Sequence, residues 1–130
     1  MAPGTGILAN TVEPERLPDW LNEQDLAYIA GEFKRTGFRG GLNWYRNIDR
    51  NWELLAPFAG LKVTVPALYV AGERDLVVAF RGVDKLLPGL SKFAPELRGT
   101  IMLPGCGHWT QQERPTEVNA AMIEFLRGLP

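Results

Sequence analysis

Helical spacing of apolar residues marks the first ordered stretch of the chain. Four apolar side chains recur at roughly helical intervals, namely Leu26, Tyr28, Ile29 and Phe33. This spacing predicts a helix that runs to about Arg35. Asn22 is suited to cap the first turn, with Asp25 three positions further on. We expect Gly37 and the pair Gly40-Gly41 to end the helix.

A second apolar face follows from about Asn43 to Leu55. Its members are largely aromatic: Trp44, Tyr45, Ile48, Trp52 and Leu55. Charged residues lie between them, which is typical of an amphipathic helix. Residues 1–16 are rich in Gly, Pro and Thr and show no periodicity, so we expect an irregular start.

The pattern changes after Pro57, where two short apolar runs have the character of strands. Residues 67–71 form a continuous apolar run that ends in Gly72, and residues 99–103 (GTIML) form a second short strand closed by Pro104-Gly105. A continuous run is typical of a strand buried on both faces, and this predicts a parallel sheet.

Helices are expected between and after these strands. Residues 77–90 are compatible with a helix broken at Pro88-Gly89, and Pro115 opens a helix through Arg127. The predicted fold class is therefore α/β, with parallel strands and flanking helices in a βαβα order. Two strands alone do not bury residues 67–71 on both faces, so this unit needs a larger sheet.

Composition narrows the classes of function. The 130 residues are 45% hydrophobic and 22% charged, with a formal net charge of −1, so no nucleic-acid or anionic-membrane partner is indicated. No apolar stretch reaches membrane-spanning length and residues 1–10 lack the character of a signal peptide. The single cysteine, Cys106, fits a reducing compartment such as the cytoplasm. With one histidine, a two-histidine metal site is excluded, and we expect no metal or cofactor.

Two chemically versatile residues come directly after the predicted strands. Asp75 follows the first strand, and His108 follows the second in the string GCGHW, 33 positions later. Carboxyl ends of parallel strands share one sheet edge, so the two side chains are expected to converge. A carboxylate that accepts from one imidazole nitrogen leaves the other free to act as a general base. The alternatives are a helix-capping Asp75 and a purely structural His108.

Three strings resemble the soluble epoxide hydrolase family of the α/β-hydrolase fold. They are FKRTGFRGGLNWYRNIDRNWEL (Phe33 to Leu54), VPALYVAGERD (Val65 to Asp75) and GCGHWTQQERPTEVN (Gly105 to Asn119). The resemblance covers about residues 18–128, and the fold orders its catalytic triad as nucleophile, acid and histidine. It implies an aspartate nucleophile that opens an epoxide to an alkyl-enzyme ester, which a histidine-activated water then hydrolyses. Two tyrosines of a helical lid would hydrogen-bond the epoxide oxygen.

Carried onto this chain, the resemblance assigns each candidate residue a role. Asp75 would orient the histidine, and His108 would activate water. Tyr45 would be one lid tyrosine; the alternative for it is packing in the aromatic cluster around Trp44. Trp109 and Val78 would line the substrate pocket or serve as ordinary packing. Residues 1–60 would be the end of the lid, and residues 61–130 the last part of the core.

The nucleophile is missing from the family pattern. The aspartates before the predicted strands are Asp19, Asp25 and Asp49, and none lies in a Gly-x-Asp-x-Gly turn. Ser91 has no flanking glycines, Cys106 lies too close to His108 along the loop, and Tyr28 sits in the wrong motif for the other lid tyrosine. We therefore expect this carboxy-terminal portion to be inactive alone, with the amino-terminal half of the enzyme or a second copy as its partner.

Two other interpretations stay open at this point. The chain could belong to a haloalkane dehalogenase or another α/β-hydrolase, in which Tyr45 has no role at the electrophile. It could also be a non-enzymatic remnant that binds a partner through an uncovered strand edge.

Overall fold

The computed structural model describes residues 11–130, which divide into two compact units. One unit ends at Ile48, and the other is Asp49–Pro130. The sequence predicts an irregular start over residues 1–16, of which residues 1–10 lie outside the described residues. Residues 11–16 form no helix or strand, as predicted.

The first helix, α1 (Glu23–Thr36), has the start and the end that the sequence predicts. The side chain of Asn22 accepts a hydrogen bond from the N–H of Asp25 at 2.9 Å, and the carboxylate of Asp25 accepts one from the N–H of Asn22 at 3.3 Å. This reciprocal pair satisfies two amides of the first turn. Gly37, at a φ of 69°, ends the helix, because that left-handed conformation strains residues with a Cβ.

The prediction of a single helix over residues 43–55 is wrong. The structure has α2 (Arg39–Arg46), α3 (Ile48–Leu55) and the short 3₁₀ helix η2 (Ala56–Phe58), with a break at Asn47. Both the side-chain amide and the N–H of Asn47 donate to the carbonyl of Asn43, and such competition for a backbone acceptor interrupts a helix. The Gly40-Gly41 pair, expected to end α1, lies inside α2 instead.

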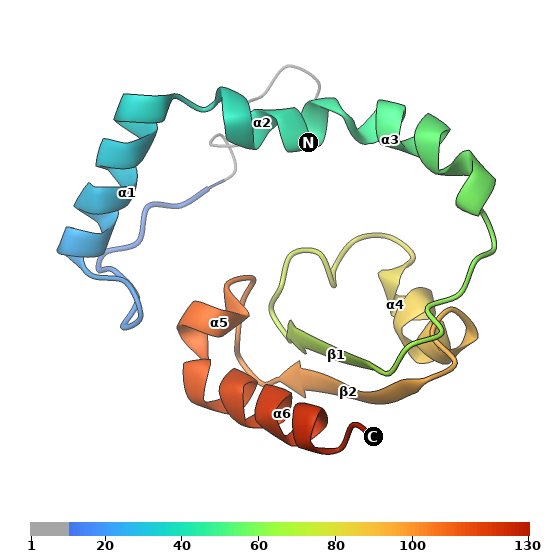
Figure 1. Ribbon diagram of the computed structural model, residues 1–130. Helices are drawn as coiled ribbons and strands as arrows, with labels where there is room; N and C mark the ends of the chain where they lie inside the picture. The colour runs from blue at the N-terminus through green and yellow to red at the C-terminus, as the bar shows by residue number, and fades with distance from the viewer. Residues whose placement is uncertain (1–10) are drawn as a thin grey trace. The chain divides into compact units, whose positions relative to one another are not determined.

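The predicted parallel strands are confirmed. Strand β1 (Ala67–Gly72) pairs in parallel with β2 (Leu97–Leu103), and Gly72 lies opposite Leu103 at their carboxyl ends. Figure 1 shows both arrowheads at the same edge of the pair. Of β1, however, only Ala71 and Gly72 are buried. The strand expected to be buried on both faces is therefore half-buried, because the described residues supply only two strands.

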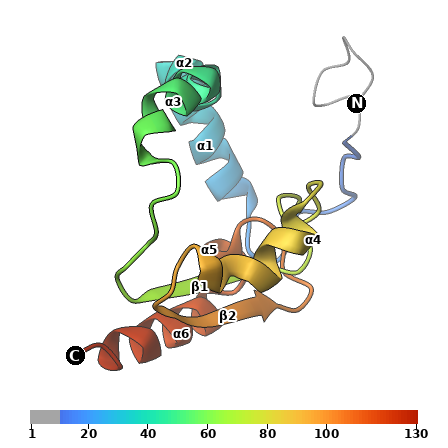
Figure 2. The same cartoon turned by 90° about the vertical axis from the view of Figure 1, so that its right-hand side faces the viewer.

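Helices lie on both faces of the strands (Figure 2). On one face is α6 (Pro115–Arg127), with the bounds that the sequence predicts. The helix expected over residues 77–90 is wrong: turns lead to the short α4 (Val83–Leu86) and the 3₁₀ helix η3 (Leu87–Lys92). Gly82, at a φ of 94°, and Pro88 confine the helical part to these residues. One further turn of helix, α5 (Thr110–Glu113), was not predicted.

The core of this unit lies where the strands end. Leu103, Cys106 and Val118 are buried together, and Val70 and Ile101 pack against them. Because α6 contributes Val118 and β2 contributes Leu103, the core fastens the loop between them. That loop carries His108. Among the described helices, none has the length and apolar character that crossing a membrane requires.

Candidate active site

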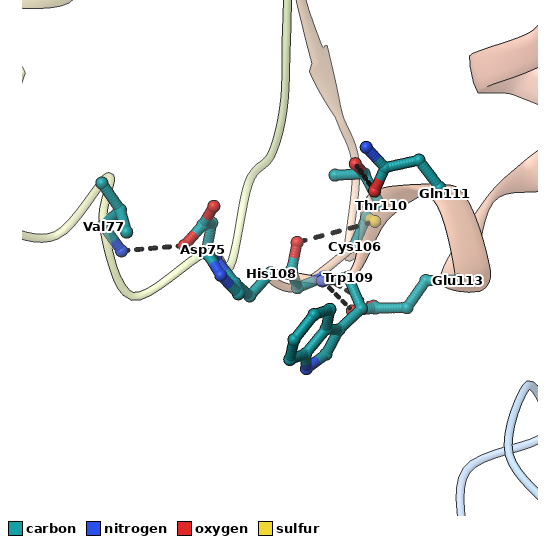
Figure 3. A network of polar contacts seen from close by, with 9 residues as sticks. Asp75, Val77, Cys106, His108, Trp109, Thr110, Gln111 and Glu113 are labelled. Atoms are coloured by element: carbon teal, nitrogen blue, oxygen red, sulfur yellow. Dashed lines mark hydrogen bonds and ion pairs between the residues drawn. The ribbon is translucent and has the colours of Figure 1, made fainter. Parts of the chain in front are cut away.

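Asp75 and His108 meet just beyond the carboxyl ends of the two strands. The Nδ1 atom of His108 lies 2.9 Å from Oδ1 of Asp75. Figure 3 shows the two side chains pointing toward each other from the loops that follow β1 and β2. The Asp75 side chain is 12% exposed and that of His108 is 46% exposed. The structure therefore brings together the two residues that the strand topology predicted would converge.

The charge of Asp75 is set by two opposing effects. Burial raises the pKa of its carboxyl group. The hydrogen bond from the N–H of Val77, the hydrogen bond from His108 and the charge of His108 together lower this pKa by more, so it lies below the usual value. An ionised carboxylate only accepts hydrogen bonds, so Nδ1 of His108 is the donor. In the neutral ring, Nε2 then has a free lone pair and can accept a proton. The capping alternative for Asp75 is met only in part: it holds the turn at Val77, and α4 begins later, at Val83.

Gly72 allows the two strand ends to come close enough for this pairing. A Cβ at Gly72 would collide with the carbonyl oxygens of Cys106 and Gly107 and lie 2.7 Å from the carbonyl carbon of Cys106. Beside it, the N–H of Arg74 donates to the carbonyl of Cys106 at 2.8 Å. A side chain at position 72 would therefore push the histidine loop away from the loop of Asp75.

The two glycines beside Cys106 each occupy a position where a Cβ would be unfavourable, for different reasons. Gly105 has a φ of +66°, a conformation that side chains with a Cβ rarely adopt. At Gly107, a Cβ would lie 2.9 Å from a carboxylate oxygen of Glu113. Cys106 itself is fully buried. Burial and the nearby charge of Glu113 raise the pKa of its thiol, which keeps it protonated and a poor nucleophile.

Two glutamates that the sequence interpretation missed fasten the histidine loop. Glu73, just after β1, accepts a hydrogen bond from the N–H of Gly105 at 2.9 Å. Glu113 accepts from the N–H of Gly107 at 2.7 Å and from the N–H of Trp109 at 3.0 Å. The sequence offered one signal for Glu113, which is the acidic residue of the GCGHWTQQE string. Hydrogen bonds from loop amides to a side chain, however, leave no periodic pattern in the sequence.

Of the other candidates, two contact the Asp75–His108 pair within the same unit. The ring of Trp109 makes an edge contact with the ring of His108, with centroids 5.2 Å apart, and the N–H of Val78 donates to the carbonyl of Asp75 at 3.0 Å. Tyr45 lies on α2 in the other unit and is 73% exposed among the described residues. Ser91 lies in η3, and Tyr28 in α1.

The hollows along the strands lie away from the pair. One of about 450 Å³ lies between β1 and α6 and is largely apolar, with Leu68, Val118 and Phe125 among its lining. Another of about 310 Å³ lies between η3 and β2. Neither includes Asp75 or His108. Within residues 11–130, no three His, Cys, Asp or Glu side chains are grouped as a metal site.

The fold and the pair together define the class of protein. Parallel strands followed by an acid and then by a histidine, with a helix after them, form the ending of the α/β-hydrolase fold. The comparisons with known proteins narrow this class, although no protein-family model matches the chain.

The relatives are epoxide hydrolases. The chain is 48% identical over 130 residues to Epoxide hydrolase A of Mycobacterium tuberculosis, a match that covers 99% of this chain and 39% of that protein. It is 44% identical over 123 residues to Bifunctional epoxide hydrolase 2 of Mus musculus, covering 94% of this chain and 21% of that protein.

Solved structures agree. Epoxide Hydrolase A from Mycobacterium thermoresistibile matches with a TM-score of 0.80 at 51% identity, over 92% of this chain and 36% of that one. A mutant of potato epoxide hydrolase matches with a TM-score of 0.89 at 37% identity, over 97% of this chain and 40% of that one. The chain belongs to the epoxide hydrolase family of α/β-hydrolases, as the resemblance predicted. It spans 39% of the length of the tuberculosis relative and 21% of the mouse one.

Proposed function

We propose that this chain supplies the acid and the base of an epoxide hydrolase, which adds water to an epoxide to give a vicinal diol. The observation that carries the proposal is the 2.9 Å contact between Asp75 and His108 at the strand ends. It occurs in a chain 48% identical to a protein named Epoxide hydrolase A.

Ring opening is the first step of the proposed reaction. A carboxylate oxygen of an aspartate outside this sequence attacks one epoxide carbon, and the bond between that carbon and the ring oxygen breaks. The ring oxygen becomes an alkoxide and takes up a proton from water, while the attacked carbon is held as an ester. Tyr45 would donate a hydrogen bond to the developing alkoxide; a phenol suits this task because it stays protonated near neutral pH.

Hydrolysis of the ester is the second step, and it is the step that this chain governs. Nε2 of His108 takes a proton from water as the water oxygen attacks the ester carbonyl. As the tetrahedral intermediate collapses, the imidazolium returns its proton to the leaving oxygen, and the diol is released. The regenerated aspartic acid then loses its proton to water and becomes the carboxylate again. Asp75 holds the ring through Nδ1 and stabilises the imidazolium that forms.

The remaining assignments complete the proposal. Trp109 and Val78, which contact His108 and Asp75 respectively, would line the substrate pocket. Residues 1–60 would form the end of a helical lid and residues 61–130 the last part of the core. The partners would be a small-molecule epoxide and the part of the enzyme that carries the nucleophile, in a reducing, cytoplasmic setting that suits the buried Cys106.

A single turnover in ¹⁸O-labelled water tests the reaction. In the complete protein, water attacks the ester carbonyl, so the oxygen delivered to the attacked carbon comes from the nucleophilic aspartate. We expect unlabelled diol from the first turnover and ¹⁸O in the protein. Labelled diol from the first turnover would show direct attack by water. The 130-residue chain alone, lacking the nucleophile, is expected to give no diol above background, a loss of about a million-fold.

A further inference from the structure

We propose that Glu113 is a positioning residue for His108. Its carboxylate holds the two peptide N–H groups that flank the histidine and so fixes where the imidazole meets the ester. This inference rests on the proposed function, because it assigns the glutamate to the hydrolytic step of that reaction.

The two oxygens of Glu113 are divided between the two sides of His108. Oε2 accepts from the N–H of Gly107 at 2.7 Å, and Oε1 accepts from the N–H of Trp109 at 3.0 Å (Figure 3). Both bonds are charge-assisted and the side chain is partly shielded from water, so each is stronger than a neutral, exposed one. The residue that carries the base thus lies between two fixed peptide groups.

The surrounding chain is built to admit this carboxylate. The single turn of α5 brings Glu113 back over the loop, and the N–H of Glu113 donates to the carbonyl of Trp109 at 2.8 Å. On the other side, a Cβ at position 107 would lie 2.9 Å and 3.3 Å from the two carboxylate oxygens, so a side chain there would displace the carboxylate from its present position.

Glu113 acts on the histidine through the backbone. The ring of His108 contacts Asp75 and Trp109, whereas the carboxylate of Glu113 is bonded to the peptide groups on either side. Loss of those bonds would let the loop shift and carry the imidazole with it. A displacement of about 1 Å in a reacting group costs about a hundredfold in rate. Ring opening, which does not use His108, would be spared.

The test is Glu113→Gln in the complete enzyme, with Glu117→Gln as the matched control. Glutamine keeps the shape but replaces one acceptor oxygen with an NH₂ group that cannot accept from an N–H. We expect hydrolysis of the alkyl-enzyme ester to slow about tenfold to a hundredfold, with ring opening changed less than about threefold. Glu117, an exposed partner of Arg114 on α6, should alter neither step. Equal slowing of both steps, or of neither, would overturn the proposal.

A readout independent of turnover is the ¹⁵N spectrum of the His108 ring, assigned by difference against His108→Gln. Glu113→Gln and Gly107→Ala should both shift the ring signals and weaken the hydrogen-bonded Nδ1 proton, whereas Glu117→Gln should leave them unchanged. Unchanged signals in Glu113→Gln would contradict the positioning role. If the wild-type protein forms no ester with any epoxide, the proposed function fails, and this spectrum still decides whether Glu113 positions His108.

Discussion

The loop that carries His108 is held differently from the helix that carries Tyr45 and the helices before and after it. The loop is fastened by bonds between distant parts of the sequence, including one from Gly105 to Glu73, and by the buried Cys106. In α1, α2 and α3, no residue is buried, and the ion pairs are local ones between exposed side chains three positions apart. Exposed pairs of this kind contribute little stability.

This difference separates what the chain builds by itself from what depends on other contacts. Asp75 and His108 are placed by strand pairing, a small core and fixed loop amides, all within one unit. Tyr45 is placed on a helix, but its exposed ring has no comparable support in its own unit. We therefore expect substitutions near the loop to change the position and the chemistry of His108. In the helices, we expect only the loss of the Tyr45 hydroxyl to change the rate of the reaction.

Among the residues that support His108, we expect Asp75→Asn to slow ester hydrolysis the most. The variant loses the charge that favours the imidazolium. Its amide can also donate to Nδ1, which favours the tautomer with the proton on Nε2 and leaves no free lone pair there. Ester hydrolysis in the complete enzyme should fall by about 10⁴-fold, as in related triads. Stopped-flow measurement of ester decay gives the rate. Asp84→Asn, on the exposed surface of α4, is the control and should leave the rate unchanged.

In the helices, Tyr45→Phe should slow ring opening and spare hydrolysis. Loss of one donor to a developing oxyanion costs about 2.7–4 kcal/mol, or about a hundredfold to a thousandfold in rate. A second lid tyrosine would soften this effect. Tyr28→Phe on α1, a similarly exposed tyrosine, serves as the control. If both variants slow ring opening alike, Tyr45 has no special role.

Two glycine substitutions, one at the strand ends and one in α2, should change the free energy of unfolding in opposite directions. Gly72→Ala places a Cβ against the carbonyls of the histidine loop, and such overpacking costs about 1–3 kcal/mol. Gly41→Ala, inside α2 with nothing within 4 Å, should instead stabilise by about 0.5–1 kcal/mol. Thermal unfolding of the complete protein measures both. A neutral Gly72→Ala would mean that the strand ends tolerate separation.

The smallest effect concerns the acid dependence of stability. The pKa of Asp75 is lowered in the folded protein, so its ionised form stabilises the fold above the usual pKa of 3.8. That contribution is lost as the pH falls below 3.8 through the folded-state pKa. The stability difference between wild type and Asp75→Asn should therefore shrink between pH 5 and pH 2, as measured by urea unfolding at each pH. A difference that stays constant over this range would contradict the pairing of Asp75.

The parts of the fold that the sequence predicts are those encoded by neighbouring residues. The cap at Asn22, the apolar run of β1 and Pro115 at the start of α6 each specify an element locally. The pairing of Asp75 with His108 follows from parallel strand topology, which places both at one edge.

Other features depend on interactions that leave no periodic pattern. The break between α2 and α3 comes from the side chain of Asn47 competing for a carbonyl, and the short α4 from the turns that precede Gly82. Glu113 was missed because its partners are loop amides, four and six positions away. Strand β1 is only half-buried because the described residues supply a single other strand, β2, to pair with it.

The central claim is that His108 serves the second step of a two-step reaction. Intact-protein mass spectrometry after one turnover of the complete enzyme tests it most directly, with His108→Gln and Tyr45→Phe compared. We predict that His108→Gln gains the mass of one epoxide as a stable ester, because ring opening proceeds and no base remains for water. Tyr45→Phe should form the ester slowly and not retain it. If His108→Gln traps no ester while Tyr45→Phe does, the roles assigned to the two residues are wrong.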